Sequence, residues 1–122
     1  MEDLVVGDLT VAVSTSDAII ICRWTGRSVE REAELALEPF FDNLLEAAGE
    51  TRSIDMHFEA LAHFNSSTIS TLIVFIQAAR RKKVPLTLHY DESLKWQRLS
   101  FDALRMFQRN DELFSLTATT NE

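Results

Sequence analysis

The chain is 122 residues long, is 46% hydrophobic and 25% charged, and has a formal net charge of −7 with a single cysteine. This length predicts one domain covering residues 1–122, and the lone cysteine excludes an intramolecular disulfide. The acidic balance argues against nucleic acid as the main partner, because binding a phosphate backbone requires a basic patch. The opening Met1-Glu2-Asp3 is unlike a secretion signal, and no apolar run approaches the roughly 20 residues of a membrane helix. We therefore expect a cytoplasmic protein with no membrane insertion.

The first half of the chain is typical of a β-hairpin followed by a helix. Residues 9–13 alternate apolar and polar side chains, and residues 18–24 are apolar and β-branched, so we expect two strands. The short turn between them, residues 14–17, predicts antiparallel pairing. Apolar side chains at helical spacing then define one face of a helix that Gly49 ends: Leu37, Phe40, Phe41, Leu44, Leu45 and Ala48.

The second half alternates strands and helices. Residues 53–58, 85–90 and 114–119 have strand patterns, and residues 69–83 predict a strongly amphipathic helix that ends in four cations. A third helical region opens at residues 91–93, with an apolar face formed by Trp96, Leu99, Ala103 and Phe107. Phe101 and Leu104 lie off that face. They are either exposed on a partner surface or buried because the helix breaks near Ser100, and we favour the second interpretation.

The order of these elements predicts an α/β fold. Strands that alternate with helices form parallel units with right-handed crossovers. We expect one domain with a mixed, mostly parallel sheet of about five strands, opened by the antiparallel hairpin. About three to four helices should pack largely on one face, and the start of the second helix should be exposed at the carboxyl end of a strand, where partner and ligand sites of such sheets tend to lie.

Four polar residues, Asn65-Ser66-Ser67-Thr68, stand at the start of the second predicted helix. The backbone N–H groups of a first helical turn are unpaired and carry partial positive charge, so this position suits a phosphate group. The same residues are also ordinary helix caps, which alone stabilise a helix by about 1 kcal/mol. From the residues alone, the motif is therefore either a cap or a phosphate site.

Residues 53–104 resemble a STAS domain, the bacterial family of anti-sigma factor antagonists. The family pattern is a strand with an aspartate, a short loop, Asp-Ser-Ser-Gly at the start of an apolar helix, then a strand and a final helix. Here Asp55 takes the place of the strand aspartate, residues 59–64 form the loop, and Asn65-Ser66-Ser67-Thr68 takes the place of the motif. Gly26 stands where the family often has a glycine after its second strand.

The resemblance implies a non-enzymatic switch without a cofactor. In the family, a partner serine kinase that is also an anti-sigma factor phosphorylates the first serine of the motif, and a PP2C-type phosphatase removes the phosphate. Carried over, Ser66 is the phosphoacceptor, and the partner-binding motif comprises Asn65, Ser66, Ser67, Thr68 and Asp55. Asn65 stands where the family motif has an aspartate, so the negative charge of that side chain is absent here. Thr68 in place of glycine narrows the approach of a partner's backbone and adds a further hydroxyl that is a phosphoacceptor or a cap.

Other site chemistries have weaker support. Asp55 and His57 share one face of a strand, and His63 or His89 would complete a three-ligand set, but no dense ligand spacing is present and we predict no metal. The sequence has neither a nucleophile constellation nor a glycine-rich phosphate loop, so neither feature indicates an enzyme. Two alternative functions are a STAS-like docking subunit of a transporter or signalling complex without phosphorylation, and a small anion-binding or ligand-binding protein that uses residues 65–68.

Overall fold

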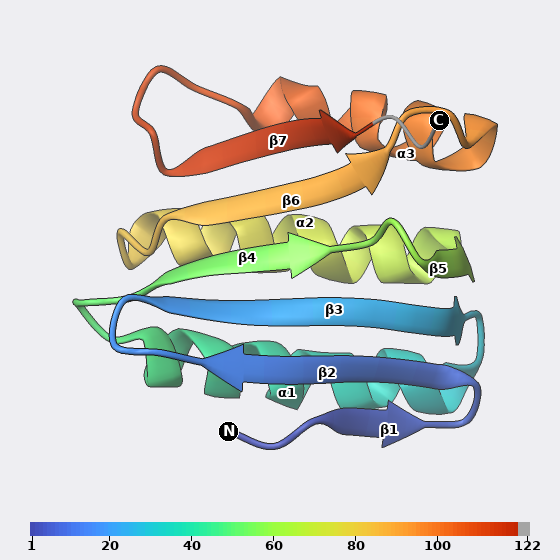
Figure 1. The fold of residues 1–122 in the computed structure, drawn as a ribbon, viewed down its shortest axis with the longest axis horizontal. Coiled ribbons are helices and arrows are strands. Elements are labelled where there is room, and N and C mark those ends of the chain that lie inside the picture. The colour runs from blue at the N-terminus through green and yellow to red at the C-terminus, as the bar shows by residue number, and fades with distance from the viewer. Residues whose placement is uncertain (120–122) are drawn as a thin grey trace.

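The computed structural model describes residues 1–119 and has one sheet backed by helices (Figure 1). The strands are β1 (Leu4–Val6), β2 (Leu9–Thr15), β3 (Ile19–Ser28), β4 (Ser53–His57), β5 (Leu61–Phe64), β6 (Leu86–Asp91) and β7 (Phe114–Thr119). The helices are α1 (Arg31–Ala48), α2 (Ser66–Arg81) and α3 (Lys95–Leu104), and a short 3₁₀ helix, η1 (Arg105–Phe107), follows α3.

The sheet is antiparallel at one edge and parallel elsewhere. Its order is β1-β2-β3-β4-β6-β7, and β5 pairs with β3 off this path. The pairs β1–β2 and β2–β3 are antiparallel, whereas β3–β4, β4–β6 and β6–β7 are parallel, as helical crossovers require. The predicted α/β class, the opening hairpin and the mostly parallel sheet are confirmed. Sequence analysis missed β1 and β5, because both are too short to show a clear alternation.

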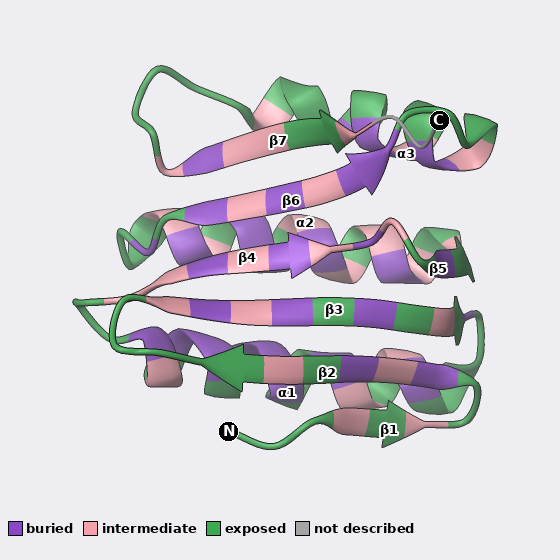
Figure 2. Cartoon of the chain, viewed as in Figure 1, coloured by how far each residue is buried: buried purple, intermediate pink, exposed green. Residues whose placement is uncertain are grey.

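All helices lie on one face of the sheet, behind the strands in Figure 1. The core lies between the two layers and is rich in aromatic contacts, such as the stacked pair Phe41–Phe75 at 4.4 Å between ring centroids and Trp24–Phe58 at 4.8 Å. The opposite side, which we call the open face, carries the partly exposed residues that alternate with buried ones along β4 and β6 (Figure 2). Within residues 1–119, no helix combines the length and the apolar character needed to cross a bilayer.

Gly26 shapes the end of β3, the strand that leads to α1. Its φ is +84°, and a Cβ at this position would lie 1.7 Å from the backbone oxygen of Asp8. Only glycine fits this backbone conformation next to β2. The pairing of β3 with β5 shifts register directly after this glycine, between Gly26 and Arg27, and then places Ser28 opposite Phe64.

The buried face of α3 differs from the predicted one. Leu99, assigned to the apolar face, is 58% exposed, whereas Phe101 and Leu104 are buried. Their burial was the favoured interpretation, but the reason given for it was wrong, because α3 runs unbroken to Leu104. The actual face is set by buried Gln97, whose amide donates to the carbonyl oxygens of Phe58 (2.6 Å) and Leu61 (3.2 Å). The burial of a polar residue such as Gln97 cannot be predicted from the spacing of hydrophobic residues.

Candidate functional site

The start of α2 lies at the carboxyl end of the parallel strands, as predicted. Strand β5 ends at Phe64, and Asn65 is the N-cap of α2 with an extended backbone (φ −95°, ψ 178°). The Asn65 carboxamide oxygen accepts the backbone N–H of Thr68 at 3.0 Å, which satisfies one of the unpaired donors of the first turn. Its amide nitrogen donates to the carbonyl of Val29 at 3.2 Å. Asn65 therefore both caps the helix and ties it to the chain that leaves β3.

Thr68 points into the protein rather than toward a partner. Its side chain is buried, and its hydroxyl lies 2.7 Å from the hydroxyl of Ser28, which is itself buried, and 3.1 Å from the Ser28 carbonyl oxygen. Either hydroxyl of this pair can be the donor, and the Thr68 hydroxyl also lies 3.1 Å from the side-chain oxygen of Asn65. Thr68 thus locks α2 onto β3, and its inward position differs from the expectation that it would narrow a partner's approach.

Ser66 is the exposed member of the motif. It is the first residue of α2 and is exposed, whereas Ser67 is half-buried. Its carbonyl accepts the hydroxyl of Ser70 one turn later at 3.1 Å, so its backbone is held within the helix. No acidic residue lies in the first turn of α2, and the dipole of this 16-residue helix points its positive end at Ser66. The position is accessible and electrostatically suited to an anion.

A shallow groove runs from this helix start between α1 and α2. It has a volume of about 340 Å³ and is lined by Glu34, Glu38, Ser67, Ser70, Thr71 and Val74. Two apolar side chains are strongly exposed on these helices, Leu35 at 62% and Val74 at 61%. The groove was not predicted from the sequence, because its walls come from two helices whose packing the sequence does not show.

Asp55 lies on the open face, away from the helix layer that α2 belongs to. Along β4 the neighbours Ile54 and Met56 are buried and point to the core, so Asp55 points outward. It contacts His89 on β6, with 3.1 Å between Asp55 Oδ2 and His89 Nε2. The structure therefore brings Asn65, Ser66, Ser67 and Thr68 together and places Asp55 with two histidines instead.

The single cysteine does not contribute a nucleophile. Cys22 lies in the middle of β3 and is fully buried. Burial raises the pKa of its thiol to about 12, so the reactive thiolate is not formed near neutral pH.

Comparisons with known proteins support the fold. No protein-family model and no curated protein matches the sequence. The crystal structure of an anti-sigma factor antagonist from Mycobacterium paratuberculosis is similar with a TM-score of 0.69 and 14% identity, over 95% of this chain and 92% of that one. An anti-sigma-factor antagonist (STAS) domain protein from Planctomyces limnophilus has a TM-score of 0.56 and 15% identity, over 89% of each chain. An uncharacterized DUF3478-family protein with a SpoIIAA-like fold from Shewanella loihica PV-4 has a TM-score of 0.56 and 9% identity, over 93% of this chain and 86% of that one.

The fold and these similarities together define the structural class of the molecule. The chain is an α/β domain with helices on one face of a mixed sheet and an exposed, capped helix start at the carboxyl edge of its parallel strands. More particularly, it has the STAS fold of anti-sigma factor antagonists, as the sequence motifs indicated. The structural similarity extends along nearly the whole chain, so it supports the overall topology and not only the helix that carries the motif.

Proposed function

We propose that this chain is a non-enzymatic regulatory module that binds a protein partner at the start of α2 and is switched by phosphorylation of Ser66. The supporting observation is the division of roles within the motif. Asn65 and Thr68 are tied inward by hydrogen bonds, whereas Ser66 is exposed at the first position of the helix. A modification of Ser66 therefore changes the surface without breaking the contacts that hold α2 to β3.

The electrostatics of the helix start support a phosphate at this position. A phosphoserine adds a charge of about −1.5 to −2 and three acceptor oxygens. Within the domain, the positive end of the α2 dipole stabilises that charge. Within a closely packed protein interface, the same charge must lose its water, which disfavours docking unless the partner supplies cations. Phosphorylation should therefore release a partner while leaving the domain folded.

The partner surface extends from Ser66 along the groove between α1 and α2. Exposed Val74 offers apolar contact, and Glu34 and Glu38 give the groove negative charge. A partner with an apolar centre and with basic groups opposite Glu34 and Glu38 on α1, but none opposite Ser66, would complement it. We propose a serine kinase that is also an anti-sigma factor as this partner, with a PP2C-type phosphatase that restores the unmodified form.

A free anion is a weaker candidate ligand for the same helix start. Residues 65–69 carry no lysine or arginine, so this segment offers a free anion N–H groups, hydroxyls and the helix dipole but no cation of its own. A covalently attached phosphate needs no binding affinity to stay in place. The same geometry therefore favours a modified serine over a ligand pocket.

The test is direct phosphorylation of the purified protein. The chain is incubated with ATP and a cognate serine kinase, and the phosphate is located by mass spectrometry. We expect phosphate on Ser66, its loss in Ser66→Ala, and its retention in the matched control Ser67→Ala. Phosphate on another residue, or none on residues 65–68, refutes the switch. Partner binding without any phosphorylation would favour a docking subunit of a transporter or signalling complex instead.

A further inference from the structure

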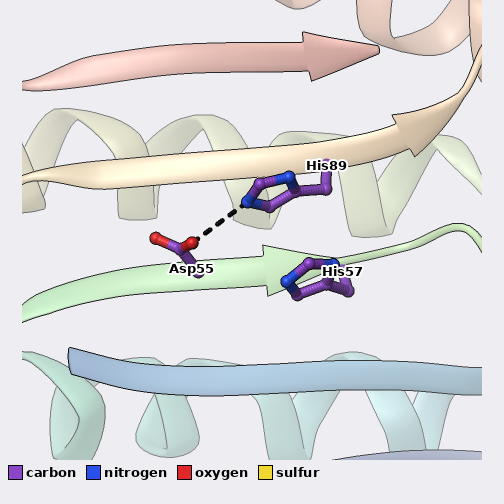
Figure 3. Close-up of side chains that lie close together, drawn as sticks. All are labelled: Asp55, His57 and His89. Carbon is purple, nitrogen blue, oxygen red and sulfur yellow. Dashed lines mark hydrogen bonds and ion pairs between the residues drawn. The ribbon is translucent and has the colours of Figure 1, made fainter. Parts of the chain in front are cut away.

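A cluster of two histidines and one aspartate lies on the open face, on the side of the sheet opposite α2 (Figure 3). It comprises Asp55 and His57 on β4 and His89 on β6. Their potential ligand atoms all lie within 4.8 Å of one another. The side chains are 24%, 21% and 18% exposed, respectively, so they are partly shielded but reachable from solvent. The proposed switch at Ser66 gives these residues no role.

Strand register brings the three side chains together. His57 and His89 are directly paired across parallel strands, and Asp55 lies two residues before His57 on the same face. The imidazole rings stack with their centroids 4.1 Å apart and their planes 4° from parallel. Figure 3 shows that both rings turn a nitrogen toward the side on which Asp55 lies. Three donor groups from two strands thus lie close together on one face of the sheet.

A fourth residue orients one of the histidines. The carboxylate of Glu59 lies 3.2 Å from Nδ1 of His57. A carboxylate that accepts Nδ1–H leaves the lone pair of the imidazole on Nε2, which is the arrangement found behind metal-binding histidines. Nε2 is the ring nitrogen left available for a ligand. Glu59 therefore lies where a carboxylate can hold the His57 ring in the orientation needed for metal binding.

We propose that Asp55, His57 and His89 form a binding site for a divalent transition metal of the zinc class. Two imidazoles and one carboxylate suit zinc, copper and nickel and do not suit magnesium or calcium, which prefer oxygen ligands. Bonds of about 2.1 Å in a tetrahedron place neighbouring ligand atoms about 3.4 Å apart. His89 Nε2 and Asp55 Oδ2 are already 3.1 Å apart. On metal binding, the two near-parallel imidazole rings rotate out of their stack so that both nitrogen lone pairs point at the ion. Water occupies the remaining position.

The surrounding charges set the strength of this site. Arg23 on β3 is directly paired with His57, and it is exposed. Its charge opposes that of a bound cation, whereas the carboxylate of Glu59 offsets it. Removing the arginine charge should therefore strengthen metal binding, and removing the Glu59 charge should weaken it. Opposite effects of Arg23 and Glu59 substitutions on metal affinity would indicate a bound cation at this position.

In the experiment, the full chain is titrated with Zn²⁺ alone at pH 7.5, and binding is measured by calorimetry. We expect a stoichiometry of one, at least a tenfold loss of affinity in His57→Gln and in His89→Gln, and a loss of about tenfold in Glu59→Gln. Arg23→Gln should bind more tightly. His63→Gln is the matched control, because His63 is the third histidine of the chain and packs beside Trp96, with 5.3 Å between ring centroids. Cys22 is buried and does not compete.

Imidazole NMR signals of the unmodified protein test the site without relying on a variant that might misfold. On addition of Zn²⁺, the signals of His57 and His89 should shift together and that of His63 should stay. The proposal is overturned if no saturable binding occurs below about 1 mM Zn²⁺ or if His63→Gln weakens binding as much as His57→Gln. Zn²⁺ binding should be unchanged in Ser66→Ala, so the metal site and the switch are tested separately.

Discussion

The buried contact between Thr68 and Ser28 fastens the start of α2 to the end of β3. Thr68→Val keeps the side-chain volume and the β-branched shape but removes the hydroxyl. The Ser28 hydroxyl, buried at 1% exposure, then loses its partner 2.7 Å away. A buried donor without a partner costs about 1–3 kcal/mol. Thr68→Ser keeps the hydroxyl and loses one methyl group, which costs about 1 kcal/mol.

Urea denaturation followed by circular dichroism measures these differences. We expect Thr68→Val to lower the free energy of unfolding by about 2 kcal/mol, which shifts the midpoint by roughly 1 M urea for a domain of this size. The double variant Ser28→Ala, Thr68→Val should lose less than Thr68→Val alone, because it removes both polar partners together. The reasoning fails if Thr68→Val is as stable as the unmodified protein, or if Thr68→Ser is the more damaging change.

Three further predictions concern single residues. Asn65→Ala removes the side-chain cap of α2, so the free energy of unfolding should fall by about 1 kcal/mol in urea titrations; an unchanged value would mean that the cap contributes nothing. Gln97→Ala removes the Gln97 Oε1 acceptor, 2.8 Å from the buried N–H of Asp91, and the amide donor to the carbonyls of Leu61 and Phe58, of which the Phe58 carbonyl keeps the N–H of Leu61. Thermal unfolding should therefore show a loss of at least 2 kcal/mol, and a loss below 0.5 kcal/mol contradicts this. Because the pKa of Cys22 is raised to about 12 from an unfolded value of 9.0, its contribution to stability is complete below pH 9 and is lost as the pH rises toward 12; Cys22→Ala should remove this part of the pH dependence, and identical profiles would refute it.

The topology was largely predictable from sequence because alternating strand and helix patterns leave few arrangements. The turn between residues 13 and 18 predicted the β2–β3 hairpin, and the helix pattern with its cationic end predicted α2 to within three residues at its start. Short β5 escaped prediction because its pairing with β3 depends on the bend after Gly26, a tertiary feature.

The roles of site residues were predictable where they depend on neighbours in the sequence and not where they depend on tertiary contacts. Asn65 as a cap follows from its position before an apolar helix. The burial of Thr68 depends on Ser28, which lies 40 residues earlier in the chain. The pairing of His57 with His89 depends on the neighbourhood of β4 and β6, so sequence analysis weighed His63 and His89 equally as partners and predicted no metal.

The role of Ser66 is tested most directly by comparing the affinity of a partner kinase for the unmodified chain and for the chain phosphorylated at Ser66. Both forms are purified, their fold is verified by circular dichroism, and binding is measured by calorimetry at one salt concentration. We expect the phosphorylated form to bind at least tenfold more weakly, a difference of about 1.4 kcal/mol, with an unchanged fold. Equal affinity of the two forms would contradict the proposed switch.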